Sequence, residues 1–119
     1  MMIFGESYYN EWLGPVYGIL IDKEEDGSVR YEEVGSVRYE EGEDEVWIDV
    51  LSFKCGYKQF ENFVEAVDIL KSMFPGKKLT GLAGPIGCYC GDVEYWVELG
   101  AITYPDPDDD IFTVFELQC

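Results

Sequence analysis

An amphipathic segment between two apolar runs constrains the fold of this chain more than any other feature. Between Gln59 and Phe74, apolar residues recur every three or four positions, so they form one stripe along a helix. Pro75 and Gly76 end this helix, because proline cannot continue the hydrogen-bond ladder and glycine accepts the backbone angles found beyond a helix end. The stripe consists of Phe60, Phe63, Val64, Val67, Leu70 and Met73.

The runs on either side of the helix have the composition of buried strands. Val46 to Phe53 precedes it and Lys78 to Ala83 follows it. A strand, a crossover helix and a second strand form a βαβ unit, in which the two strands are parallel. Asp49 lies inside the first run, and a carboxylate on a buried strand needs a partner. The apolar residues expected in the core from this run are Trp47, Ile48, Val50, Leu51 and Phe53.

Charge is the strongest departure from an ordinary composition. The 119 residues include 25 acids, 8 bases and no histidine, a net charge of -17, while 47% of them are apolar. This length and apolar content predict one globular domain, residues 1-119. The acids concentrate in Asp22 to Asp49 and in Asp92 to Asp110. Such a field repels nucleic acid, anionic lipid and anionic cofactors, and it attracts basic protein surfaces.

The cysteines and the apolar runs bear on compartment and metal binding. The pair Cys88 and Cys90 has one residue between its members, which is too few for a zinc site, and no histidine can complete one. No run is long and apolar enough to span a membrane, and the first residues lack the features of a signal peptide. We therefore expect a cytoplasmic protein without a metal, although the redox state of Cys55, Cys88, Cys90 and Cys119 stays open.

The amino half reads as antiparallel strands around a repeat. Met2 to Tyr9 and Val16 to Asp22 are predicted strands, and Asp26-Gly27 is a hairpin signal. The sequence Gly-Ser-Val-Arg-Tyr-Glu-Glu then occurs twice, at residues 27–33 and 35–41. The two copies form either one long strand or a hairpin that folds back at Val34-Gly35. In one strand, the even period of eight places four residues on one face: Val29, Tyr31, Val37 and Tyr39.

The carboxyl half resembles a known family. A second helix is expected at about residues 92–99, within the sequence Tyr95 to Ala101 (YWVELGA), and a closing strand pair lies around Pro105 to Glu116. With the βαβ unit, this order of elements resembles the GNAT superfamily of acyl-CoA N-acyltransferases over residues 46–117. The resemblance implies an α/β fold, with a GNAT-like mixed sheet in which antiparallel amino-terminal strands precede the βαβ unit. The expected core stripe of the second helix is Val93, Trp96, Val97 and Gly100.

The chain departs from the family where the chemistry would occur. The resemblance implies a glycine-rich loop around the coenzyme pyrophosphate, but residues 55–60 offer only Gly56 and Lys58 as contacts, among bulky side chains. It also implies a tyrosine that protonates the leaving thiolate, and Trp96 stands at that position. Tyr95 is adjacent, but neighbours on a helix point about 100° apart. A general base would have to be a carboxylate such as Asp49, Asp92 or Glu94. We therefore expect no coenzyme and no catalysis.

Three functions remain, and the charge favours the first. It is a non-catalytic inhibitor that imitates nucleic-acid charge in the basic groove of a nucleic-acid-binding protein, similar in charge and size to phage-encoded blockers of restriction or CRISPR systems. The second is an N-acetyltransferase with a diverged coenzyme loop that acts on a cationic amine. The third is a plain acidic interaction domain, with a possible homodimer through a strand edge. The residues expected to bind the basic partner are Glu32, Glu33, Glu40, Glu41, Glu43, Asp44, Glu45, Asp106, Asp108, Asp109 and Asp110.

Overall fold

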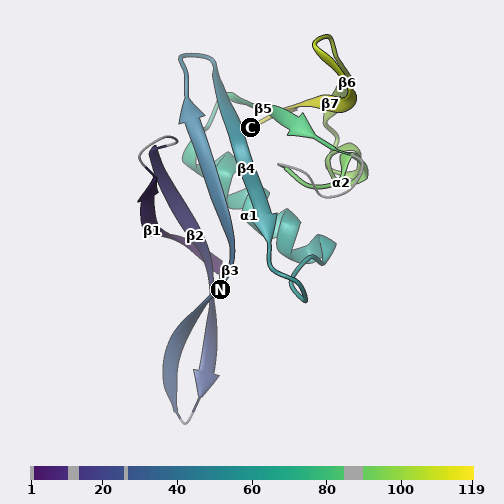
Figure 1. Ribbon diagram of the computed structural model, residues 1–119. Coiled ribbons are helices and arrows are strands. Elements are labelled where there is room, and N and C mark those ends of the chain that lie inside the picture. The colour runs from purple at the N-terminus through teal and green to yellow at the C-terminus, as the bar shows by residue number, and fades with distance from the viewer. Residues whose placement is uncertain (1, 11–13, 26, 85–89) are drawn as a thin grey trace.

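The protein is a mixed α/β structure built on one seven-stranded sheet (Figure 1). The computed structural model describes residues 2–10, 14–25, 27–84 and 90–119. The sheet order is β1-β2-β3-β4-β5-β7-β6, in which β4 and β5 are parallel and every other neighbouring pair is antiparallel. The elements are β1 (Met2–Asn10), β2 (Gly14–Glu25), β3 (Ser28–Glu41), β4 (Glu45–Phe53), α1 (Phe60–Met73), β5 (Lys78–Ala83), α2 (Val93–Glu98), β6 (Ile102–Asp106) and β7 (Asp109–Gln118).

The helix expected between Gln59 and Phe74 is confirmed as α1. It begins after Gln59, whose carbonyl accepts the Phe63 N–H at 3.2 Å, and ends at Phe74, two residues before Gly76 with a φ of 81°. Its buried residues are Phe63, Ala66, Val67 and Leu70. Met73 is 41% exposed, so its expected place in the core is wrong. The next residue, Phe74, is buried instead, and its ring contacts Tyr39 edge-on.

Both helices contribute to one hydrophobic core against the sheet. Phe63 of α1 packs edge-to-face on Trp96 of α2 with ring centroids 5.0 Å apart, and Trp96 stacks on Phe115 of β7. These rings join α1, α2 and β7 in a single buried cluster. Val97 is 52% exposed, which corrects its expected place in the core stripe of the second helix. A six-residue helix offers only one buried large side chain to the core, and here it is Trp96.

The repeat forms one continuous strand, β3, rather than a hairpin. Its pairing with β2 shifts by one residue, because Ile19 lies opposite Gly35 whereas Leu20 lies opposite Glu33. Val34 is therefore an inserted bulge residue, and a bulge reverses the alternation of faces along a strand.

Because of the bulge, equivalent residues of the two repeat copies do not lie on one face of the strand, although their spacing predicted that they would. Tyr31 pairs with Asp22 and Val37 pairs with Tyr17. Directly opposed residues share a face, and residues 17 and 22 of β2 lie on opposite faces because five positions separate them. Tyr31 is accordingly 51% exposed, whereas Val37 is fully buried.

A second bulge lies in β4. Arg38 pairs with Val50 and Tyr39 pairs with Ile48, so Asp49 is the inserted residue. The guanidinium of Arg38 forms an ion pair with the Asp49 carboxylate, which provides the partner that the sequence required. Val46, Ile48 and Leu51 are the buried residues of β4, while the other three expected core residues, Trp47, Val50 and Phe53, are only half-buried.

No helix in the described part of the chain is both long enough and apolar enough to cross a membrane.

Candidate functional site

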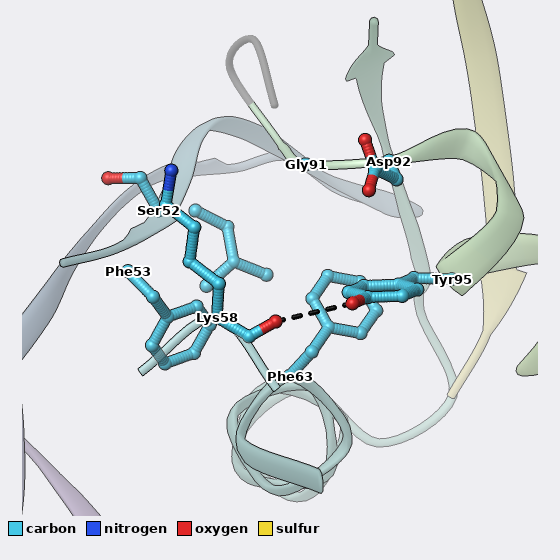
Figure 2. A pocket seen from close by; sticks show the side chains of 8 residues that line it. Ser52, Phe53, Lys58, Phe63, Gly91, Asp92 and Tyr95 are labelled. Atoms are coloured by element: carbon cyan, nitrogen blue, oxygen red, sulfur yellow. Dashed lines mark hydrogen bonds between the residues drawn. The ribbon is translucent and has the colours of Figure 1, made fainter. Parts of the chain in front are cut away.

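A pocket opens at the carboxyl end of β4, between the beginnings of α1 and α2 (Figure 2). Its volume is about 120 Å³. This is the position at which open α/β sheets bind their ligands, since strand ends and helix beginnings meet there. The lining residues are Leu51, Ser52, Phe53, Lys58, Phe63, Gly91, Asp92 and Tyr95.

The pocket forms where the two parallel strands separate. The pairing of β4 with β5 covers Glu45 to Ile48 against Lys78 to Gly81, although β4 continues to Phe53 and β5 to Ala83. The last pair precedes the bulge at Asp49. A bulge bends its strand and increases the twist, so the end of β4 leads away from β5. The space beyond this separation lies beside Leu51, Ser52 and Phe53, which line the pocket.

Tyr95 is held against α1 and carries the only phenol among the lining residues. Its hydroxyl donates to the backbone carbonyl of Lys58 at 3.2 Å (Figure 2). Its ring packs on Phe60 and Phe63, with centroid distances of 5.1 and 5.3 Å. The pocket thus lies on the Tyr95 side of α2, and Trp96 points into the core instead. The 100° between helical neighbours, which argued against Tyr95, is what brings it to the pocket.

The loop from Lys54 to Gln59 borders the pocket at Lys58 and has open space at Gly56. Gly56 has a φ of 94°, and a Cβ at this position would meet no atom within 4 Å. The Gln59 side chain donates to the Gly56 carbonyl at 2.7 Å, and Asn62 donates to the Tyr57 carbonyl at 3.1 Å. Tyr57 and Phe60, which were expected to fill this loop, pack against the hydrophobic core.

One lysine, Lys58, lines the pocket, and a second, Lys54, directly follows the lining residue Phe53 in the chain. Lys54 and Lys58 are both exposed. Within the described ranges, neither ammonium lies within 4.0 Å of a carboxylate oxygen, whereas Lys77 and Lys78 are ion-paired elsewhere. Asp92 lines the opposite wall as a half-buried carboxylate. The lining therefore combines apolar side chains with one cation (Lys58), one anion (Asp92) and the hydroxyls of Ser52 and Tyr95, which suits a small ligand with a charged or polar end.

The acidic residues expected to bind a basic partner fall into separate groups. Glu40 is ion-paired with Arg38, Glu41 with Lys77, and Glu45 lies 3.8 Å from Lys78. Glu43 and Asp44 are exposed in the turn between β3 and β4.

The remaining acids lie on other parts of the sheet. Glu32 and Glu33 are half-buried in the first repeat copy. Asp106 and Asp108 share a turn, in which the Asp106 side chain accepts the Asp108 N–H at 3.0 Å. Asp109 and Asp110 begin β7, and their side chains lie outside the described part of the structure.

A lysine separates the two acidic hairpins. β5 lies between the β3–β4 hairpin and the β7–β6 hairpin, and its Lys78 donates to Glu116 at 2.8 Å while approaching Glu45. Glu116 also accepts from the Tyr104 hydroxyl. Lys78 and then Tyr104, as donors, lower the pKa of Glu116, so this carboxylate stays charged and paired. The acidic segments are thus interrupted along the sheet rather than continuous.

The described cysteines do not form a site. Cys90 is buried, and its burial raises the pKa of its thiol to about 12, which keeps it unreactive. Cys55 is exposed in the loop before α1. Cys88 lies outside the described residues. No group of three or more metal-binding side chains occurs among the residues that the structure describes.

One spacing in the sequence indicates the pocket, although it is not part of the motifs of the family that the chain resembles. Asp92 and Tyr95 are three residues apart, a spacing that places both on one side of a helix. The remaining lining residues come from the end of β4, where alternation alone could not reveal the bulge. Comparisons of the chain with protein-family models, with curated proteins and with solved structures give no match.

Proposed function

We propose that the chain is a GNAT-type acyltransferase that binds the acyl end of an acyl-CoA in the pocket and transfers the acyl group to a cationic amine. The observation that carries this proposal is the place of the pocket, where β4 separates from β5 and Lys58 and Tyr95 meet. The rest of the coenzyme would extend over the open loop at Gly56, past Lys54. Lysines of this kind attract phosphate.

The arrangement of the sheet supports the resemblance at the level of fold. Antiparallel strands β1 to β4 precede one parallel neighbour, β5, and the closing hairpin β6–β7 follows α2. This order agrees with what the resemblance implies for residues 46–117. Fold alone does not assign an activity, so the side chains of the pocket have to account for the chemistry.

Two groups of the pocket, the Asp92 carboxylate and the Tyr95 phenol, can carry acyl transfer. The cationic acceptor first loses one proton to water, and the neutral amine then attacks the thioester carbonyl, so that a C–N bond forms and the C–S bond breaks. The Asp92 carboxylate takes the proton that the amine loses, and the Tyr95 phenol gives its proton to the leaving thiolate. The bond from Tyr95 to the Lys58 carbonyl is long for an O–H···O bond at 3.2 Å, so the hydroxyl can exchange this acceptor for the thiolate.

Two features of the sequence argued against catalysis, and the positions of these side chains around the pocket weaken both arguments. The bulky loop residues Tyr57 and Phe60 pack on the core and are not among the residues that line the pocket. Trp96 at the family's tyrosine position matters less, because Tyr95 supplies a phenol on the pocket side. The acidic surroundings repel the coenzyme at long range but attract a cationic acceptor amine.

The decisive test is a thermal-shift titration with acetyl-CoA. A ligand at about ten times its Kd stabilises the native state by roughly 1.4 kcal/mol. For a chain of this length, that raises Tm by roughly 3 to 6 °C. Lys58→Glu should reduce the shift, whereas the matched control Lys71→Glu, at the far end of α1, should retain it. The proposal fails if acetyl-CoA leaves the Tm of the wild-type chain unchanged.

A second candidate is the acidic protein that occupies a basic groove. It is favoured by β3, which carries the glutamates of both repeat copies on one strand of 14 residues. At ~3.3 Å per residue, such a strand spans about 46 Å. The ion pairs of Glu40, Glu41 and Glu45 weigh against it.

Affinity capture from a cell lysate tests this second candidate. Salt elution of a nucleic-acid-binding protein from the wild-type chain would support it. Capture should then be lost when the exposed acids Glu43, Asp44 and Asp108 are replaced by lysine. Capture that survives those substitutions would argue against it.

A further inference from the structure

The first repeat copy lies on a two-stranded ribbon that projects from the sheet (Figure 1). β1 pairs with β2 only as far as Ile21, and β4 pairs with β3 only from Gly35 onward. Asp22–Glu25 and Ser28–Tyr31 therefore pair only with each other in the described part of the chain, while Glu32 and Glu33 pair with Ile21 and Leu20 of β2 and have no strand on their other side. The ribbon gives the molecule a longest dimension of 51 Å. A ribbon of two strands with no further neighbour has little stability of its own in water.

The free edge of this ribbon belongs to the first repeat copy. The second copy has the same sequence and pairs with β4. The second copy, residues 35–41, uses its β4-facing edge for seven backbone pairs. The first copy, residues 27–33, is identical in sequence, and its corresponding edge has no strand beside it among the described residues. An unpaired edge is a template for a further strand, and the charges on this edge, Arg30, Glu32 and Glu33, restrict the register in which a partner strand can pair.

We propose that this edge pairs antiparallel with the same edge of a second copy of the chain, centred on Tyr31. In this register, Arg30 of each copy lies opposite Glu32 of the other, and the two Tyr31 side chains lie on the same face. Tyr31 is 51% exposed in the single chain, which leaves it available for that contact. The surface is separate from the pocket, so this interface goes beyond the proposed transferase activity.

Charge complementarity selects this register over its neighbours. A shift of the centre by one residue toward the carboxyl end places Glu32 opposite Glu32, and a shift by one residue toward the amino end places Arg30 opposite Arg30. Like charges in direct opposition destabilise a strand pair. The register centred on Tyr31 instead forms two Arg–Glu pairs related by a two-fold axis, as in most homodimers.

The net charge of each chain makes this association dependent on salt. Two bodies of charge -17 repel each other at low ionic strength. Salt at about 0.5 M screens this long-range repulsion and leaves the backbone hydrogen bonds intact. Sedimentation velocity should therefore show a monomer at low salt and a concentration-dependent dimer at high salt. A monomer under every condition would overturn the proposal.

A charge-swap series tests the register. Arg30→Glu alone and Glu32→Arg alone each place like charges opposite each other, and each should weaken dimerisation about tenfold. The double substitution restores opposite charges and should recover the wild-type association. Glu43→Arg, in the exposed turn after β3, changes the net charge as Glu32→Arg does and should leave the dimer intact. A dimer that neither single substitution weakens would refute the interface.

A crosslink provides a second measurement that does not depend on charge. Directly opposed Cα atoms in antiparallel strands lie about 4.5 to 5.5 Å apart, which is within reach of a disulfide. Tyr31→Cys, in a background in which every cysteine except the buried Cys90 is serine, should form a covalent dimer on mild oxidation. Ser28→Cys in the same background should not, because its counterpart lies several residues away. Equal crosslinking of both variants, or none at Tyr31→Cys, contradicts the register. Unchanged melting curves show that the variants are folded.

Discussion

The indole of Trp96 stacks on the ring of Phe115, with centroids 3.7 Å apart and planes inclined by 9°. Both side chains are fully buried. The indole Nε1–H also donates to the carbonyl of Cys90 at 2.9 Å. One side chain thus joins α2 to β7 and to the segment before α2. These contacts give the indole of Trp96 a structural role in the core.

Replacement of Trp96 should therefore affect stability strongly. Trp96→Ala removes the stacked ring and leaves a cavity, and we expect the free energy of unfolding to fall by about 3 to 5 kcal/mol. Trp96→Phe keeps part of the packing but leaves the Cys90 carbonyl without its donor, and should cost about 1 to 3 kcal/mol. Urea unfolding measures both. The neighbouring Val97 is 52% exposed, and Val97→Ala should change stability by less than about 0.5 kcal/mol. Equal losses at the two positions would contradict this view of α2.

Tyr95→Phe separates the chemistry of the pocket from its packing. The variant keeps the ring contacts with Phe60 and Phe63 but has no hydroxyl to protonate a thiolate. We expect the rate of acyl transfer from acetyl-CoA to fall by about 100-fold or more, as for loss of a general acid. Tm should change little, since the lost bond is exposed. Release of free coenzyme thiol in the presence of amines measures the rate.

Tyr104→Phe is the control for that experiment. It also removes a phenol, one that donates to Glu116 and lies outside the pocket. The rate of this variant should match that of the wild type. A Tyr95→Phe variant that is as active as Tyr104→Phe would remove Tyr95 from the mechanism.

The central elements could be predicted from the sequence because their signals are local. The 3.6-residue period between Gln59 and Phe74 and the apolar composition of two flanking runs gave α1, β4 and β5 with nearly correct bounds. Their parallel pairing followed from the length of the crossover. None of these predictions required knowledge of which residues lie opposite each other across the sheet.

The bulges at Val34 and Asp49 could not be predicted, because they depend on that pairing. Each inserts one residue in a strand whose composition is otherwise regular. The first placed Tyr31 and Tyr39 on opposite faces, although their surroundings in sequence are identical. The second marks the end of the pairing between β4 and β5, where the pocket forms. The pocket therefore could not be predicted from the sequence, because its formation depends on strand register, which local sequence patterns do not determine.

The ion pair at the second bulge should contribute measurably to stability. Arg38 and Asp49 have side chains that are only 11% and 27% exposed. Arg38→Leu leaves the Asp49 carboxylate partly buried without this partner, and should cost about 1 to 3 kcal/mol. Asp49→Asn in the Arg38→Leu background removes the unpaired charge and should recover part of that loss. A double-mutant cycle from urea unfolding gives the coupling, and strictly additive effects would show that the pair contributes nothing.

Tyr39 should make the protein lose stability at alkaline pH. Its ring stacks on Tyr17 with centroids 5.5 Å apart and contacts Phe74 edge-on. Burial, followed by the effects of Tyr17 and Glu41, raises the pKa of Tyr39 to about 12. In the unfolded chain a tyrosine ionises near pH 10. Below pH 10 both states hold the proton, so the full stability is present, and it declines as the pH rises from about 10 to about 12.

The loss due to Tyr39 should be about 1 kcal/mol, because the phenol is only partly buried and solvent screens the effect. Tyr104 and Lys78 also have raised pKa values through their bonds to Glu116, so the wild-type curve contains more than one contribution. Tyr39→Phe isolates the share of Tyr39. Urea unfolding at pH 8 gives the reference difference between variant and wild type, and that difference should move in favour of the variant by about 1 kcal/mol toward pH 12. A constant difference across this range would show that Tyr39 ionises equally easily in both states and that its burial beside Tyr17 does not raise its pKa.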